Sequence, residues 1–512
     1  MVARSVARLA VVTALICVPA SVLCAPAIAA PADLDRSFGG DGIVEVPGPG
    51  GASFPSEAGA RMAIGPKDEI FVLSSNYPPC NPPFNCTVEL TVARYGPDGE
   101  QDTSFGAGAG PQLVVHQNAF EHNFGLAVGP DGKPVVTTVD EPEDALYVAR
   151  LGLDGRLDGS FGVGGKTEHL STHTIEVARG GSAVAVQPDG KILVAAETNR
   201  EPDSSELILA RYLPNGEFDP GFGSGGEVAM TMGTQMRPAN VLVDPGGNIS
   251  VPGPGCCVGG TPLFGEGLSV ARFLTNGAPA ASWAGSGRLF LPTPGAQSSV
   301  EGVALAPDGG MFVVFEESTS TVSTVGNIVK LLPDGAPDAN FGNGGRIALF
   351  SRVGSVSPYG IAIDRQGRIV GVGWDGRISV FRLRADGSAD RTFNGGQRLV
   401  LPYGGGTSMP YMVGLQSSGR IIAFGDSGCC GGKGFALIGM HGGTDHTRCL
   451  KHKATIVGTN GPDEITGTPR RDVIASLGGK DTVRGLSGAD LICGGKGRDK
   501  IFGGAGRDQV RQ

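Results

Sequence analysis

The sequence predicts an all-β protein, a seven-bladed β-propeller followed by a small parallel β-roll. Glycine accounts for 86 of the 512 residues and only 18% of residues are charged, which is typical of turn-dense β proteins and not of helical ones. One motif recurs seven times at intervals of 52 to 67 residues, and another recurs six times at intervals of nine. Hydrophobic residues make up 40% of the chain, enough for a substantial core.

Residues 1–29 have the pattern of a secretory signal peptide. Arg4 and Arg8 precede an apolar run over residues 9–23, and residues 27–29 supply the small side chains of a cleavage site. The run is short for a membrane span, and Leu23 is too bulky beside Cys24 for lipoprotein processing. We therefore expect a secreted protein with no transmembrane segment in the mature chain.

Charge and cysteine content agree with export. Loss of Arg4 and Arg8 changes the formal net charge from -9 to -11, which argues against a nucleic-acid partner. Eight cysteines remain, an even number that favours disulfides in an exported chain. A bridge between Cys449 and Cys493 would close 44 residues and contribute about 2–4 kcal/mol. The pairing of the other cysteines stays open.

The longer repeat occupies residues 31–443. Each copy contains a hairpin such as "VAVQPDGKILVAA", a strand such as "LILARYLPNG", an SFG-like motif, and a further strand such as "GGEVAM". Pro, Asp and Gly suit the tight turns between these strands. Seven four-stranded copies predict a closed propeller in which the first strand of the chain completes the last blade. A linear β-solenoid is the alternative, but its repeats are usually much shorter.

An aromatic residue stands in every SFG-like motif, and we expect it to fill the gap between neighbouring blades. These anchors are Phe38, Phe105, Phe161, Phe222, Trp283, Phe341 and Phe393. A basic residue before the motif and an aspartate within it recur together, which predicts one structural ion pair per blade. The pairs are Arg94 with Asp102, Arg150 with Asp158, Arg211 with Asp219, Lys330 with Asp338, and Arg382 with Asp390; Arg272 recurs without its aspartate.

The copies resemble the delta-60 repeat family, a bacterial repeat named for its period. The "PDGKI" hairpin followed by "ARY.PDG..D.SFG" carries this resemblance over residues 34 to about 440. The fifth copy departs from it, with Ala280 and Trp283 in place of Asp and Phe. The resemblance implies a propeller-like fold and almost nothing about biochemical activity.

The nine-residue repeat runs without insertion from Gly458 to Arg511. Its sixth position is always aspartate and its eighth is always β-branched. The residues at the eighth position are Ile465, Ile474, Val483, Ile492, Ile501 and Val510. A flexible linker would not keep two residue types in step, so this region predicts a coil of short strands with the β-branched side chains facing inward.

These units resemble the calcium-binding nonapeptide repeats of haemolysin-type (RTX) proteins, whose form is G-G-x-G-x-D followed by an apolar position. The resemblance implies that Ca²⁺ binds between turns stacked two units apart, held by aspartates and by carbonyl oxygens that glycine leaves uncovered. The candidate metal residues are Asp463, Asp472, Asp481, Asp490, Asp499, Asp508, Gly479, Gly488, Gly494, Gly495, Gly497, Gly503, Gly504 and Gly506.

We expect residues 458–512 to form the roll and residues 444–457 to form a linker. The favoured sites use Asp481 with Asp499 and Asp490 with Asp508, while Arg470 replaces a turn glycine in the second unit. Nine basic and seven acidic side chains from residue 454 onward give the tail a net charge of +2. This charge predicts weak, extracellular-grade affinity of roughly 10⁻⁴–10⁻³ M. A metal-free roll is the alternative.

The leading functional hypothesis is a secreted calcium-binding scaffold whose propeller recognises an unknown extracellular protein or glycan. The alternative is a secreted enzyme, a hydrolase or lyase acting on glycans, with its active site in the central funnel. No GxSxG elbow, P-loop or paired-carboxylate motif favours catalysis. Convergent acidic or histidine side chains in the funnel would favour the enzyme.

Overall fold

The structure is a computed structural model, and part of the chain is described in it. The expected signal peptide lies outside that part, as do Cys80, Cys257, Cys429 and Cys430. The described residues are 34–47, 60–76, 86–107, 112–117, 124–140, 145–169, 182–201, 204–232, 235–236, 238–256, 267–292, 298–320, 323–349, 357–374, 376–390, 393–401, 408–426, 434–442, 448–450, 452–454, 456–457, 464–476 and 478–511.

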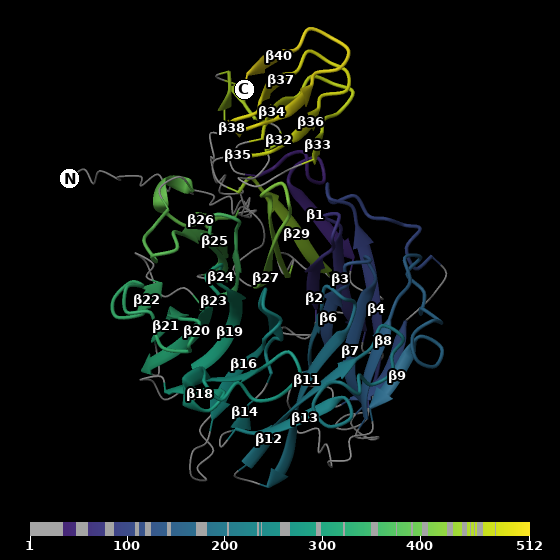
Figure 1. Cartoon of the computed structure of the whole chain (residues 1–512), viewed down its shortest axis with the longest axis vertical. Helices are drawn as coiled ribbons and strands as arrows, with labels where there is room; N and C mark the ends of the chain where they lie inside the picture. Colours follow the sequence, from purple (N-terminus) through teal and green to yellow (C-terminus); the bar gives the residue numbers. More distant parts are fainter. Residues whose placement is uncertain are drawn as a thin grey trace, which may run out of the picture.

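Seven antiparallel sheets form a ring, and each sheet is one blade (Figure 1). Blades 1 to 3 consist of β2 (Arg61–Ile64), β3 (Ile70–Asn76), β4 (Cys86–Tyr95) and β5 (Leu113–Gln117); β6 (Gly125–Val128), β7 (Pro134–Asp140), β8 (Ala145–Arg150) and β9 (Lys166–His169); and β10 (Ala183–Val186), β11 (Ile192–Glu201), β12 (Ser204–Tyr212) and β13 (Glu227–Thr231).

Blade 4 differs from the others because its first strand is divided in two. It consists of β14 (Gln235–Met236), β15 (Leu242–Val243), β16 (Ile249–Cys256), β17 (Gly267–Phe273) and β18 (Arg288–Pro292). Blades 5 and 6 consist of β19 (Ser298–Leu305), β20 (Met311–Ser320), β21 (Ser323–Leu331) and β22 (Arg346–Leu349); and β23 (Ser357–Ile363), β24 (Ile369–Trp374), β25 (Ile378–Leu383) and β26 (Leu399–Val400). Short 3₁₀ turns, η2 (Trp283–Gly285) and η3 (Asn394–Gly396), lie within two SFG-like motifs.

The two ends of the repeat array meet in blade 7, which closes the ring. Its strands are β27 (Pro410–Leu415), β28 (Ile421–Asp426), β29 (Gly434–Met440) and β1 (Ile43–Pro47). β1 pairs with β29 in antiparallel register from Ile43 opposite Ile438 to Pro47 opposite Gly434. The prediction that the first strand completes the last blade is therefore confirmed.

The aromatic anchors lie between blades, as the sequence predicts. All seven are at most 7% exposed. A Cβ added at Gly155, in a turn of blade 2, would meet the Phe105 ring at 2.8 Å, and Gly155 also has a φ of +79°. The backbone N–H of Gly106 donates to Asp154 O at 2.8 Å. Within the described residues, the same ring contact and the same backbone hydrogen bond to a glycine turn of the next blade recur at all the anchors except Phe393.

The predicted ion pairs are present, which confirms their structural role. The five N–O distances run from 2.6 to 2.9 Å. Hydrogen bonds from Ser104 and Arg94 lower the pKa of Asp102 to about 2. Arg211 also donates to Thr275 O of the next blade at 2.5 Å. The other three arginines of these pairs also donate to a carbonyl of the next blade, so the arginine pairs join blades as well as bracing each one.

Two blades lack one member of the pair, and each compensates differently. Ala280 replaces the aspartate in blade 4, and Arg272 pairs with Asp244 instead. In blade 7, Gly439 stands at the arginine position, and Arg420 from the preceding hairpin bonds Asp35 at 2.6 Å. A side chain at Gly439 would collide with the Phe38 ring. The guanidinium group is therefore supplied by Arg420, from elsewhere in the blade.

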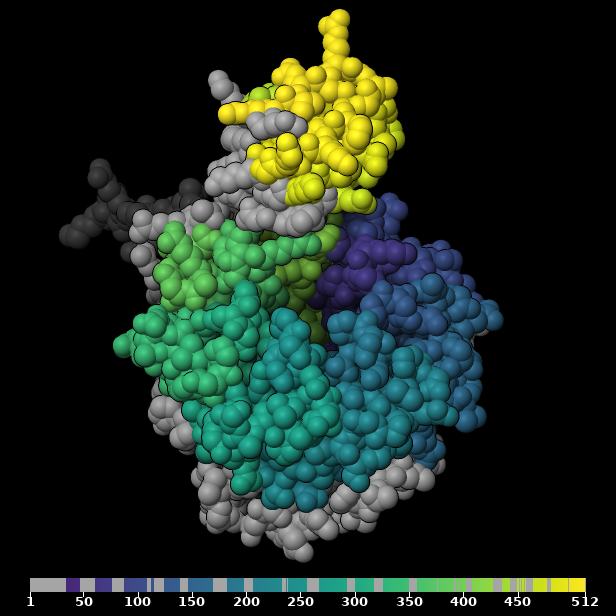
Figure 2. All heavy atoms as spheres, viewed as in Figure 1, coloured from purple at the N-terminus to yellow at the C-terminus, as the bar shows by residue number. Residues whose placement is uncertain are grey.

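The C-terminal region is a parallel β-roll (Figure 1), and its atoms are the yellow group in Figure 2. Its strands stack in three parallel sheets, and paired residues are eighteen apart, which is two nonapeptide units. The sheets consist of β32 (Ile456–Val457), β34 (Val473–Ala475), β37 (Leu491–Cys493) and β40 (Gln509–Arg511); β33 (Glu464–Thr466), β36 (Thr482–Arg484) and β39 (Lys500–Phe502); and β35 (Gly478–Gly479) with β38 (Lys496–Gly497).

The β-branched residues of the repeat form the core of the roll. Four of them are buried together, with Ile456 and Ile501 partly buried beside them: Ile465, Ile474, Val483 and Ile492. Val510, in the last strand, is 48% exposed. The inward position is therefore confirmed for the stacked units and is exposed in the terminal one.

Two residues of the segment expected as a linker, Ile456 and Val457, lie in a strand of the roll. Ile456 lies in β32 and pairs in parallel with Ile474, which adds a strand before the first recognised unit. The hairpin of β30 (Arg448–Cys449) and β31 (His452–Lys453) places Cys449 against Val473 and Leu491. Cys449 and Cys493 form the expected disulfide, with Cα atoms 5.4 Å apart.

The two larger sheets of the roll have different outer faces. The outer face that carries Val473 and Leu491 is apolar and is covered by the β30–β31 hairpin. The other sheet exposes Arg484, Lys500 and Phe502. Within the described residues, no helical segment is long and apolar enough to cross a membrane.

Candidate metal centre

The turns of the roll depend on glycine at two positions of the nonapeptide. The fourth position has φ near +140° at Gly488, Gly497 and Gly506, and the second has φ of +78° and +99° at Gly495 and Gly504. Residues with a Cβ rarely adopt these angles. Gly479 is also in place, paired with Gly497 between β35 and β38. The candidate glycines therefore shape the turns.

One turn departs from this rule. Leu486 stands at the second position of the fourth unit and has φ of +75°. A leucine in the left-handed region is strained by about 1–2 kcal/mol. Its side chain is 44% exposed, so burial compensates for little of this strain.

The candidate aspartates are stacked two units apart. The backbone N–H of each aspartate donates to the carboxylate Oδ1 of the aspartate eighteen residues later. The donor–acceptor distances are 2.8 Å for Asp472 and Asp490, 3.1 Å for Asp481 and Asp499, and 3.0 Å for Asp490 and Asp508. Asp463 lies outside the described residues. The structure brings the five described aspartates into two rows along the roll, with the spacing that the sequence indicates.

The second carboxylate oxygen of these aspartates faces the first residue of its own unit. A Cβ atom added to Gly494 would lie 2.6 Å from Asp499 Oδ2, and one added to Gly503 would lie 2.5 Å from Asp508 Oδ2. A Cβ atom added to Gly485 would lie 2.6 Å from Asp490 Oδ2 and would also be in close contact with Gly503 O. We call this space at Gly485 the oxygen cradle.

Asp490 is the most buried of these aspartates. It is 0% exposed, and its Oδ2 has no hydrogen-bond partner among the described residues. A buried carboxylate oxygen without a partner is costly unless a proton or a cation compensates its charge. Gly503 O beside it is also an acceptor, so the two oxygens cannot bond each other. The cradle therefore fits a cation that prefers oxygen ligands.

The donor set favours calcium among such cations. Ca²⁺ accepts carboxylate and backbone carbonyl oxygens in flexible geometry. In the described part of the chain, no three His, Cys, Asp or Glu side chains gather into a group that could hold a metal, so backbone carbonyls have to supply part of the coordination. Lys480, Arg498 and Arg507 are exposed directly before three of the aspartates and oppose a cation electrostatically.

The sequence prediction included the first position of the unit at Gly494 and Gly503 but omitted it in two earlier units. Gly467 and Gly485 were absent from the candidate residues, although each faces the Oδ2 atom of its own aspartate. Their place in the nonapeptide was the available signal, because the first position is glycine in five of the six units.

The inner strands of the propeller carry few charged groups. From β2, β6, β10, β14, β15, β19, β23 and β27, the charged residues are Arg61 and Glu301. Burial lowers the pKa of the Arg61 guanidinium. These strands offer no carboxylate pair of the kind that the glycan-enzyme alternative requires.

Fold and site together define a β-propeller protein with a nonapeptide β-roll. Residues 187–222 and 367–393 match a β-propeller family described as a domain of unknown function (DUF5122), and residues 457–492 and 476–510 match the RTX calcium-binding nonapeptide repeat. The chain therefore carries a DUF5122 propeller with delta-60-like repeats and C-terminal RTX repeats. RTX repeats typically bind Ca²⁺ as a structural ion.

Several solved structures are similar to this chain at low sequence identity. The chain is similar to PorZ of the Porphyromonas gingivalis type-IX secretion system (12% identity, TM-score 0.42, covering 78% of this chain and 49% of that one). It is also similar to YCF48 bound to D1 peptide (11%, 0.40, covering 78% and 96%) and to a putative glucose dehydrogenase of Thermus thermophilus (14%, 0.36, covering 62% and 96%). It spans about half the length of PorZ. No curated protein matches the sequence.

Proposed function

We propose that the protein is a secreted calcium-binding scaffold, in which the roll holds Ca²⁺ at its turns and the propeller recognises an extracellular protein or glycan. The observation that carries calcium binding is the buried, unpartnered Oδ2 of Asp490 beside a carbonyl oxygen. The RTX match supports the identity of the ion. The disulfide and the N-terminal signal pattern support export.

The bound ion has a structural role in this proposal. Asp472, Asp481, Asp490, Asp499 and Asp508 are the carboxylates that would hold it, together with backbone carbonyls of the glycine turns. An ion between a carboxylate of one unit and a carbonyl two units later links neighbouring layers of the roll. The four-residue core supplies little burial, so we expect calcium to provide a large part of the folding free energy of the roll.

The test is a calcium titration of the full chain by calorimetry and far-UV circular dichroism. Calcium should bind with a dissociation constant of roughly 10⁻⁴–10⁻³ M and increase the β signal. Asp490→Asn should weaken binding. Asp131→Asn, in a propeller hairpin where Asp131 accepts from Lys133 N–H, is the matched control and should leave binding unchanged. Absence of calcium binding in the wild type would refute the proposal.

A further inference from the structure

We propose that Ser476 and Thr468 confine the strongest calcium binding of the roll to a single site, the oxygen cradle at Gly485, which residues 485–490 and 503–508 form. This inference rests on the proposed function and specifies it, because it predicts which of the repeated turns binds the ion. The nonapeptide pattern alone treats the turns as equivalent. The structure shows three different local arrangements at the same position of the unit.

Gly467, Ser476 and Gly485 each occupy the first position of a unit on which the second following unit is stacked. Their backbone N–H groups make the same contact, from Gly467 to Arg484 O at 2.7 Å, from Ser476 to Cys493 O at 2.9 Å, and from Gly485 to Phe502 O at 2.8 Å. The backbone hydrogen bond is therefore the same at all three positions. What differs is the side chain present and the partner of the aspartate.

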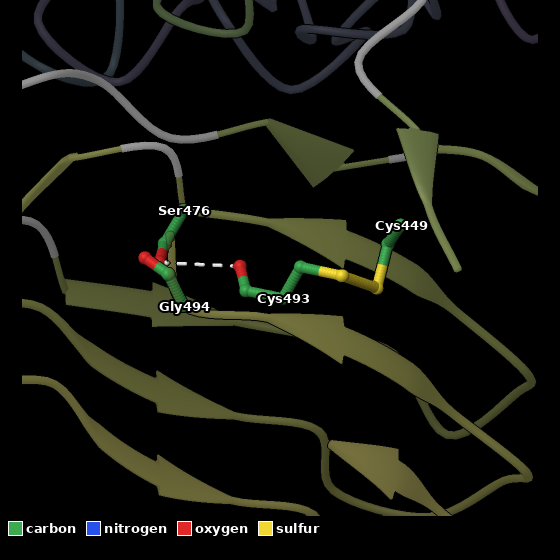
Figure 3. Close-up of a disulfide and its surroundings, with 4 residues drawn as sticks. All are labelled: Cys449, Ser476, Cys493 and Gly494. Carbon is green, nitrogen blue, oxygen red and sulfur yellow. Dashed lines mark hydrogen bonds between the residues drawn. A yellow bond between two sulfur atoms is a disulfide. The ribbon is translucent and has the colours of Figure 1, made fainter. Parts of the chain in front are cut away.

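At the second of these positions a side chain fills the space. Ser476 is 0% exposed, and its Oγ donates to Gly494 O at 2.8 Å. Gly494 O corresponds to Gly503 O in the cradle. Figure 3 shows Ser476 facing Gly494, beside the disulfide of Cys493. The hydroxyl hydrogen takes the place of a cation against this carbonyl, and the side-chain atoms take up the room.

At the first position the aspartate is already satisfied by the protein. Thr468 N–H donates to Asp472 Oδ2 at 2.7 Å, and Thr468 Oγ1 lies 3.1 Å from the same atom. A cation here would have to replace these hydrogen bonds, whereas at Asp490 it would coordinate an oxygen that has none from the described residues. The gain in free energy from binding is correspondingly smaller.

At the third position neither feature is present. Gly485 has no side chain, and Leu486 stands where Thr468 does but has no hydroxyl. Asp490 Oδ2 keeps its unpartnered, buried state. Of the three positions, the cradle at Gly485 alone combines an uncovered carbonyl with a carboxylate oxygen that lacks a hydrogen bond.

The experiment is calcium calorimetry on the full, disulfide-bonded chain with three substitutions. Ser476→Gly should open a second tight site and raise the count in the tightest class from one to two. Gly485→Ser copies the Ser476 arrangement into the cradle and should weaken the tightest affinity by about tenfold or more. Gly467→Ser is the matched control, and it should leave the count at one because Asp472 is already bonded.

Circular dichroism and thermal unfolding at saturating calcium would check that each variant is folded. An unchanged count in Ser476→Gly, or several equal tight sites in the wild type, would overturn this inference while calcium binding itself stands. A wild-type protein that binds no calcium would refute the proposed function instead. Ser476→Gly is a gain-of-binding test, so it stays decisive even if Gly485→Ser does not fold.

Discussion

In the propeller, the turn aspartates Asp131 and Asp219 have partners in their own chain, whereas in the roll Asp490 keeps an oxygen without one in the described part of the chain. Asp131 accepts a hydrogen bond from Lys133 N–H, and Asp219 pairs with Arg211 at 2.8 Å. In the roll, Asp490 keeps a buried oxygen without a hydrogen-bond partner among the described residues. The same residue type therefore has its hydrogen bonds completed by the chain in the propeller, and in the roll it leaves an oxygen that the proposed calcium ion would satisfy.

The two regions also differ in how much apolar surface they bury. The cluster between blades 3 and 4 contains fourteen buried apolar residues, from Ala183 to Phe273. The core of the roll contains four. Since stability rises with buried apolar area, the propeller is expected to fold by itself. Under the proposed function, we expect the roll to depend on calcium and on its disulfide.

Removal of calcium should have the largest effect and should act on one region only. In chelator, amide hydrogen exchange should show loss of protection across residues 456–511, because the four-residue core cannot offset the entropy of so many glycines. The blades should keep their protection. A roll that stays protected in chelator would remove the distinction between the two regions.

Breaking a buried ion pair should be the largest effect within the propeller. Arg211→Met leaves Asp219, whose side chain is 8% exposed, with Lys191 as its remaining basic partner. We expect a loss of about 3 kcal/mol in thermal or denaturant unfolding, with calcium binding unchanged. The control is Arg94→Met, whose partner Asp102 is 32% exposed and which should cost about 1 kcal/mol. Equal losses would mean that burial does not determine the strength of these pairs.

Loss of the disulfide should destabilise the roll and leave the propeller unchanged. The double substitution Cys449→Ser and Cys493→Ser opens a loop of 44 residues and should cost the roll about 2–4 kcal/mol. Thermal unfolding at saturating calcium would measure this loss. If the propeller transition shifted as well, the β30–β31 hairpin would have to stabilise both regions.

Acid should have the smallest effect, and it should act on the propeller. The folded pKa of Asp102 is about 2, below its ordinary value of 3.8, because Ser104 and Arg94 hydrogen-bond the charged form. Its contribution to stability is therefore present above pH 3.8 and is lost as the pH falls toward about 2. Melting temperatures between about pH 4 and about pH 2 should fall less steeply in Asp102→Asn than in the wild type. Parallel slopes would contradict this.

The structural features that recur in every repeat could be predicted from the sequence. Seven aromatic anchors at a regular period required seven equivalent interfaces, and the strand over residues 43–47 had no partner in its own copy except across a closed ring. The eighteen-residue stacking followed from the alternation of turns along a nine-residue unit. These features depend on local pattern, which a single sequence displays.

Features that break the repeat were not predictable in the same way. Arg420 replaces an arginine that Gly439 cannot supply, and the two residues are neighbours only in the folded blade. Ile456 continues the roll without glycine or aspartate to mark its unit. Ser476 looks like a neutral substitution until the carbonyl opposite it is known. Each depends on a contact that sequence spacing does not reveal.

The pairing of β1 with β29 also constrains the order of folding. These strands meet across almost the whole length of the ring, with Ile43 opposite Ile438. Contacts between residues so distant in sequence form late, because the intervening chain must be ordered first. Until then β1 is an unpaired edge that other chains could join. The last blade is therefore the stage at which this protein is most exposed to misassembly.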